Sequence, residues 1–174
     1  MLDTSWLLLN GTILFEVIGT LAFALSGLIE AARKRLDLVG MAMVSGLAAF
    51  GGGTLRDVLL DRRPFFWFEN EIWVWIILLI CIGALLFMRS RHLEPTERAM
   101  QWPDAIGLGA FTAGGTQLAL NAGVPAVISV IMGVLTAIFG GVLRDIVVNE
   151  IPKALAITSH MPLLPSREDG LWWP

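Results

Sequence analysis

The residues in this chain that could do chemistry stand in two matching groups. Each group consists of two glycines, one variable residue and then Leu-Arg-Asp, at residues 52–57 and again at residues 140–145. Gly51 extends the first glycine run to three. Each group therefore places a helix-weakening segment directly before a neighbouring arginine and aspartate.

The glycines could open the helices that contain them. A glycine weakens a helix by about 1 kcal/mol relative to alanine, so three in a row predict a break or kink after Phe50. Free carbonyl groups at the end of the upstream half favour cations, and free N–H groups at the start of the downstream half favour anions such as a carboxylate. An amino-acid zwitterion could use both. The alternative is that the glycines only let helices pack closely, as small residues do in membranes.

Long apolar stretches surround these groups and identify an all-α, polytopic membrane protein. Hydrophobic residues make up 56% of the 174 residues, charged residues only 16%, and the mean hydropathy is +0.73. About 20 consecutive apolar residues span a bilayer, and the backbone in lipid must satisfy its own hydrogen bonds, so we predict membrane helices. They cover about 15–32, 36–60, 72–88, 104–121 and 124–148. The net charge of −3 does not indicate a nucleic-acid partner, and the single cysteine, Cys81, is expected to be a packed thiol.

Basic residues predict the orientation. Cytoplasmic loops carry an excess of Lys and Arg. The loops after the first and third segments hold three such residues each, whereas the N-terminus and the loop at 121–123 hold none; the intervening second loop carries Arg62 and Arg63. We therefore expect the N-terminus on the outer side of the membrane. The start lacks a basic region and a cleavage site, so we expect it to be retained rather than removed as a signal peptide.

The chain also matches itself when it is shifted by 88 residues. Residues 16–64 align with residues 104–152 without a gap, and 15 of the 49 positions are identical. Three segments separate the start of one copy from the start of the next, and an odd number reverses direction, so the copies are expected to be inverted. Inverted repeats are typical of transport proteins, whose binding sites lie at interrupted segments in matching positions of the two halves. We therefore take these residues as candidate pore or substrate-binding residues: Gly51, Gly52, Gly53, Arg56, Asp57, Gly140, Gly141, Arg144 and Asp145.

The two arginines need partners in a membrane. Neighbouring residues point about 100° apart on a helix, so Arg56 and Asp57 are not expected to pair. Arg56 and Asp145 are not expected to pair either. Arg56 lies about 30 Å along its helix, near the outer boundary of the membrane, whereas the same count places Arg144 near the inner boundary.

Two acidic residues at matched positions are better partners. Glu16 opens the first segment where the second ends with Arg56, and Asp104 stands in the same relation to Arg144. We predict the ion pairs Glu16–Arg56 at the outer mouth of the pathway and Asp104–Arg144 at the inner mouth. The alternative is that acids at helix starts and bases at helix ends only complement the helix dipoles.

At residues 51–57 and 140–145 the chain resembles a known family. These stretches, and residues 15–20 and 24–27, resemble bacterial inner-membrane proteins with two glycine-transporter domains, which are similar in fold to trimeric intracellular cation (TRIC) channels. The resemblance covers residues 15–152. It implies a homotrimer whose protomers each hold a pathway lined by the first, second, fourth and fifth helices. It also implies transport of K⁺ or another monovalent cation, or of glycine, without a cofactor or a nucleic-acid partner.

The chain departs from this family toward its end. The family has seven helices, and the sixth should begin near His160, yet residues 160–170 hold two prolines and three charged residues, which cannot span a membrane. We therefore expect a three-helix repeat at 15–90, a two-helix repeat at 103–152 and a non-membrane tail at 153–174. A truncated, non-transporting remnant is the alternative function.

An intramembrane enzyme is not expected. His92 and His160 fall in predicted loops, no spacing of metal ligands occurs, and no Ser–His or paired-Asp arrangement stands out. We accordingly assign no catalytic and no metal-binding residues.

Overall fold

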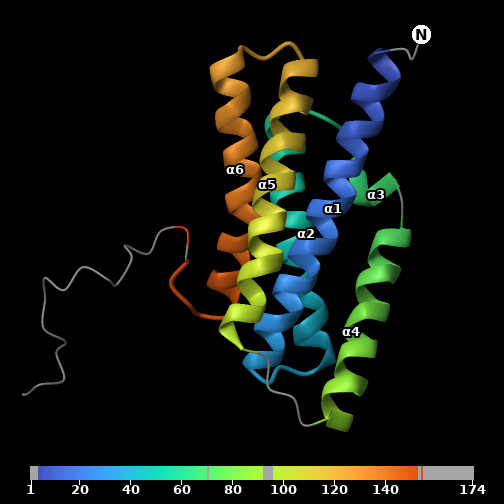
Figure 1. Ribbon diagram of the computed structural model, residues 1–174, viewed down its shortest axis with the longest axis vertical. Coiled ribbons are helices and arrows are strands. Elements are labelled where there is room, and N and C mark those ends of the chain that lie inside the picture. Colours follow the sequence, from blue (N-terminus) through green and yellow to red (C-terminus); the bar gives the residue numbers. More distant parts are fainter. Residues whose placement is uncertain (1–3, 70, 92–95, 153, 155–174) are drawn as a thin grey trace, which may run out of the picture.

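The chain is all-helical in the computed structural model, which describes residues 4–69, 71–91, 96–152 and 154. Within these ranges there are six helices and no strands (Figure 1). They are α1 (Thr4–Arg33), α2 (Leu38–Leu59), α3 (Phe66–Glu69), α4 (Ile72–Arg91), α5 (Glu97–Asn121) and α6 (Ala126–Val147). The predicted fold class is confirmed. The expectations for His92, His160 and the tail from residue 155 lie outside the described residues.

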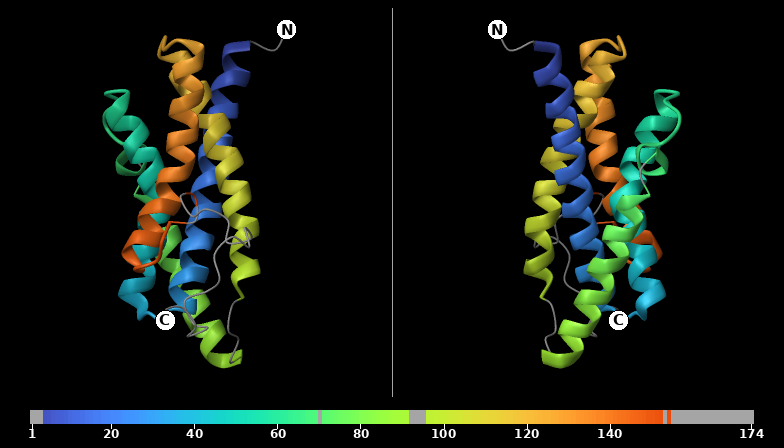
Figure 2. Two further views of the ribbon diagram at one scale, coloured as in Figure 1. Left: turned by 90° about the vertical axis from the view of Figure 1, so that its left-hand side faces the viewer. Right: turned by 90° about the vertical axis from the view of Figure 1, so that its right-hand side faces the viewer.

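Four long helices, α1, α2, α5 and α6, pack together as a bundle, and α4 lies outside it against α2 and α1 (Figures 1 and 2). Figure 1 shows that α1 and α6 run down the view whereas α2 and α5 run up it. The helices that the repeat matches, α1 with α5 and α2 with α6, are therefore antiparallel. This is the arrangement that an inverted repeat requires.

Each of the five predicted segments corresponds to one long helix, and apart from shifts of one to three residues at helix ends there are three differences. Helix α5 begins at Glu97 rather than near residue 104. The helix α1 begins at Thr4 rather than near residue 15, because the short apolar stretch at residues 6–9 continues into it. The four-residue helix α3 was not predicted, since so short a segment has no periodicity. Among the described residues, three helical stretches are long and apolar enough to cross a membrane: Gly11–Arg33, Leu38–Leu59 and Ala126–Val147.

The distribution of polar residues is the reverse of that in a soluble bundle. Large apolar side chains such as Val39, Val127 and Leu86 are more than 60% exposed on the outer surface. The interior instead buries charged and hydroxyl side chains, among them Thr20, Ser26, Glu30, Ser45, Arg56, Asp57, Thr136, Arg144 and Asp145. An apolar exterior of this extent is suited to lipid, and the buried ionisable residues are therefore the candidates for a functional site.

The contact between α4 and the bundle is apolar. Ile77 and Cys81 of α4 pack into a cluster with Leu28 of α1 and Met41 and Val44 of α2. The thiol of Cys81 is buried and lies 3.7 Å from the hydroxyl of Ser45. Cys81 is thus a packed thiol, as predicted.

Candidate functional site

The matched glycines position the site by letting the two halves of the repeat approach each other. A Cβ atom at Gly52 would lie 2.0 Å from the carbonyl oxygen of Thr136, and one at Gly140 would lie 2.4 Å from the carbonyl oxygen of Ala48. The shift of 88 residues relates these two contacts to each other. The backbones of α2 and α6 therefore cross in contact, which only glycine permits at these positions.

The same reciprocity holds where α1 crosses α5. The ring of Phe111 occupies the space beside Gly19, and the ring of Phe23 occupies the space beside Gly107. The two rings lie 5.4 Å apart between their centroids. At both crossings, each contact made by one copy of the repeat has a matching contact made by the other copy. The two copies therefore pack around a common centre.

The predicted break in the second segment is wrong. Helix α2 runs without interruption from Leu38 to Leu59, through Gly51, Gly52 and Gly53, and α6 runs likewise through Gly140 and Gly141. At Gly51, Gly52 and Gly140 the weak helix propensity of glycine is offset by close packing against the opposite helix, so the alternative of a packing role describes these three residues.

The first arginine lies in a network of two carboxylates at the end of α2. Its Nη2 atom is 2.5 Å from Oε1 of Glu16 on α1, and its Nε atom is 2.8 Å from Oδ1 of Asp57. Arg56 is only 1% exposed and Asp57 is fully buried. We call Glu16, Arg56 and Asp57 the first triad.

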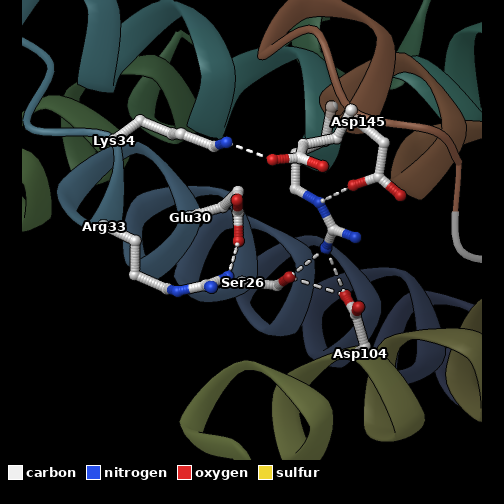
Figure 3. Close-up of polar contacts among 8 residues, drawn as sticks. Ser26, Glu30, Arg33, Lys34, Asp104 and Asp145 are labelled. Carbon is white, nitrogen blue, oxygen red and sulfur yellow. Dashed lines mark hydrogen bonds and ion pairs between the residues drawn. The ribbon is translucent and has the colours of Figure 1, made fainter. Parts of the chain in front are cut away.

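The second arginine repeats this arrangement at the end of α6. Arg144 places Nη1 2.6 Å from Oδ1 of Asp104 on α5 and Nε 2.8 Å from Oδ1 of Asp145. We call these three residues the second triad. The hydroxyl of Ser26 on α1 donates to Asp104 over 2.6 Å and accepts a hydrogen bond from Arg144. Figure 3 shows Ser26, Asp104 and Asp145 converging on one guanidinium group. Ser26 thus ties the first copy of the repeat to the triad of the second.

The structure contains both ion pairs that the repeat suggested, and it corrects the prediction about neighbours. Arg56 pairs with Asp57, and Arg144 pairs with Asp145. The Cα–Cβ bonds of neighbours do diverge, but the long arginine side chain bends back far enough for its guanidinium group to reach the next carboxylate.

The acids of the two triads do not act as helix-start charges. Glu16 lies about three turns after the start of α1 at Thr4, and Asp104 follows Pro103 inside α5, which starts at Glu97. The helix dipole acts on charges within the first turn. The dipole alternative therefore does not explain these two acids.

A cavity of about 220 Å³ adjoins the second triad. Its lining includes Asp104, Arg144 and Asp145 together with Gly141, Phe23 and Ala154. The cavity is large enough to hold several waters or a small hydrated ion.

Further polar contacts near this end of the bundle were not predicted. Arg33 pairs with the buried Glu30 at 2.7 Å, and Lys34 pairs with Glu150 beyond the end of α6. Figure 3 shows Glu30, Arg33 and Lys34 near the second triad. Ser26 and Glu30 could have been singled out as polar residues inside an apolar segment, because such residues are expensive in a membrane.

Comparisons with known proteins agree with this fold. The model of the glycine transporter family matches residues 13–89 and 101–164. The chain is 37% identical over 158 residues to a UPF0126 membrane protein of Vibrio cholerae, an alignment that covers 88% of this chain and 62% of that relative. It is 34% identical over 140 residues to the UPF0126 inner membrane protein YadS of Escherichia coli, covering 80% of this chain and 67% of YadS. The chain thus spans about three-fifths of the first relative.

Two solved structures are similar as well. One is a TRIC trimeric intracellular cation channel orthologue from Rhodobacter sphaeroides, with a TM-score of 0.76 and 37% identity over 84% of this chain and 74% of the channel. The other is a prokaryotic TRIC channel in 0.5 M KCl, with a TM-score of 0.73 and 30% identity over 83% of this chain and 73% of that one. With the family model matching most of its length, the chain belongs to the glycine transporter family of bacterial membrane proteins.

Proposed function

We propose that this chain is a membrane transport protein for a small monovalent cation such as K⁺, with its pathway between α1, α2, α5 and α6. The observation that carries this proposal is the charge of the two triads. Each triad holds two carboxylates against one guanidinium group, so each has a formal charge of −1. The same excess occurs at both ends of an inverted repeat.

An excess negative charge inside an apolar bundle favours a cation. Removing a charged group from water costs several kcal/mol unless an opposite charge compensates it. In the first triad the Oδ2 atom of Asp57 is buried without a hydrogen-bond partner among the described residues. A monovalent cation would compensate the charge and use this free oxygen, since K⁺ is bound in channels by oxygen atoms that replace its hydration shell.

Glycine is the second candidate, which the family description supports. A zwitterion needs a site for its carboxylate as well as for its ammonium group. The sequence offered such a site only through helix breaks, whose free N–H groups would bind the carboxylate. Because α2 and α6 are continuous through their glycines, these N–H groups are used within the helices. The relatives of known structure are described as cation channels, which also favours the cation.

The assembly and orientation follow as parts of the same proposal. The channel orthologue from Rhodobacter sphaeroides is described as trimeric, and a homotrimer with one pathway in each protomer is proposed here by similarity. The excess of basic residues after the first and third predicted segments supports an N-terminus outside the membrane.

The test is to measure K⁺ flux and glycine uptake side by side in proteoliposomes. We expect K⁺ flux that falls in Asp57→Asn and in Asp145→Asn, because each substitution changes the formal charge of its triad from −1 to zero. Asp37→Asn is the matched control: Asp37 caps α2 through Gly40, outside both triads, and asparagine caps helices equally well. Saturable glycine uptake without K⁺ flux would overturn the proposal, and flux of neither solute would favour the non-transporting alternative.

A further inference from the structure

The two triads have the same arrangement, but the residues that follow α2 and α6 in the chain and lie against the triads differ. The shift of 88 residues that matches the triads also matches Phe66 with Ala154. Phe66 is the first residue of the short helix α3, and Ala154 lies beyond the end of α6. The two ends of the bundle therefore carry a large aromatic ring and a methyl group at corresponding positions.

Phe66 covers the first triad. It is only 8% exposed, and its ring centroid lies 6.0 Å from Cζ of Arg56. The ring also fills the space beside Gly53, where an added Cβ would lie 2.6 Å from Cε1 of Phe66. A guanidinium group over an aromatic face is attracted by the ring quadrupole, so the ring is held by the charge that it covers.

Neighbouring aromatic residues support this ring. Phe50 meets Phe66 edge to face, with centroids 5.9 Å apart, and stacks on Trp67 at 5.5 Å. The indole N–H of Trp67 donates to the hydroxyl of Thr54 on α2 over 3.1 Å. The position of α3 against α2 is thus specified by several contacts.

The corresponding space at the second triad is hollow. The cavity of about 220 Å³ lies there, lined by Asp104, Arg144, Asp145 and Ala154. An added Cβ at Gly141, the counterpart of Gly53, would have no neighbour nearer than 3.8 Å among the described residues. The space that Phe66 fills at one end is thus not filled by any described residue at the other.

We propose that Phe66 is an aromatic plug that shuts Arg56 and Asp57 of the first triad off from water, whereas Arg144 and Asp145 of the second triad line a cavity that water can enter. The proposal rests on the proposed function, because the plug regulates the same cation pathway. A cation that has reached the second triad leaves past the first only when α3 moves and carries the ring away from Arg56.

The first test is K⁺ flux in proteoliposomes, with both triads left intact. We expect Phe66→Ala to raise flux about tenfold. This corresponds to the loss of roughly 1.4 kcal/mol that holds the pathway closed, which is within the range of a cation–π contact with a desolvated partner. Ala154→Phe should lower the flux by filling the second cavity. Phe68→Ala is the control, because Phe68 lies on the same short helix but is 67% exposed. An unchanged flux in Phe66→Ala, or the same increase in Phe68→Ala, would overturn the plug.

The second test does not depend on transport. In a Cys81→Ala background, cysteines introduced as Asp57→Cys and Asp145→Cys report access of a water-soluble methanethiosulfonate reagent to each triad. We expect Asp145→Cys to be labelled and Asp57→Cys to be protected. Adding Phe66→Ala should expose the cysteine at residue 57, and adding Ala154→Phe should protect the one at residue 145.

The two tests separate the plug from the proposed function. The expected labelling without K⁺ flux in any variant would keep the plug and reject the cation pathway. Labelling of residue 57 at the same rate with and without the Phe66 ring would reject the plug, whatever the flux.

Discussion

Replacing Gly52 with alanine tests the crossing that brings the two copies of the repeat together. The new methyl group would lie 2.0 Å from the carbonyl oxygen of Thr136, whereas ordinary contacts of a Cβ atom begin near 3.4 Å. The neighbour is a backbone atom and cannot rotate away, so α2 and α6 must move apart. Arg56 follows Gly52 by about one turn, so the displacement also reaches the first triad.

The magnitude follows from two opposing effects. Overpacking of a close contact costs about 1–3 kcal/mol, and at 2.0 Å from a backbone oxygen we take the upper part of this range. The higher helix propensity of alanine returns up to about 1 kcal/mol. We therefore expect Gly52→Ala to destabilise the protein by about 1–2 kcal/mol.

Gly46→Ala is the matched control on the same helix. An added Cβ at Gly46 has no neighbour within 4 Å among the described residues, so only the gain in helix propensity should remain, and the variant should be neutral or stabilised by up to about 1 kcal/mol. The assay is the midpoint of thermal unfolding of the purified protein in detergent, followed by the fraction that still elutes as folded protein. If Gly52→Ala proved as stable as Gly46→Ala, the role of Gly52 as a contact residue would be refuted.

Three further predictions concern the buried polar residues. Ser26→Ala should lower the free energy of unfolding by about 1–3 kcal/mol, because it removes a hydroxyl that bonds to Asp104 and Arg144 at once. Thermal unfolding in detergent checks this, and an unchanged midpoint would contradict it. Glu16→Arg should abolish K⁺ flux by placing two cations together, and the addition of Arg56→Glu should restore it; absence of rescue would show that the contact of 2.5 Å has no role in transport. Thr20→Val should raise stability by about 1 kcal/mol, because the Thr20 hydroxyl is buried without a hydrogen-bond partner among the described residues and valine has nearly the same shape; a lower unfolding midpoint would contradict this account.

Much of the architecture was predictable because it depends on patterns along the chain. Apolar segments of membrane-spanning length predict helices whatever their partners are, since the backbone in lipid has few alternatives. The gapless repeat shifted by 88 residues predicted that α1 corresponds to α5 and α2 to α6. Matched acids and arginines then identified Glu16 with Arg56 and Asp104 with Arg144, because a charge inside a bundle requires an opposite charge.

The role of the glycines was decided by the tertiary structure alone. Local propensity says that three glycines weaken a helix, but it does not say what stands opposite them. Here the carbonyl oxygens of Thr136 and Ala48, each in the other copy of the repeat, fill the space beside Gly52 and Gly140. The close approach of the two backbones offsets the low helix propensity of glycine, so the helices remain continuous.

The difference between the two triads also arises only in three dimensions. The sequence by itself determined that the chain carries an inverted helical repeat and that each copy contains Gly-Gly-x-Leu-Arg-Asp. It did not show that Ser26 of the first copy bonds to Arg144 of the second, or that Phe66 covers Arg56 while a cavity adjoins Arg144. These contacts join residues far apart in the sequence, and short-range patterns carry no information about which side chain fills the space beside another helix.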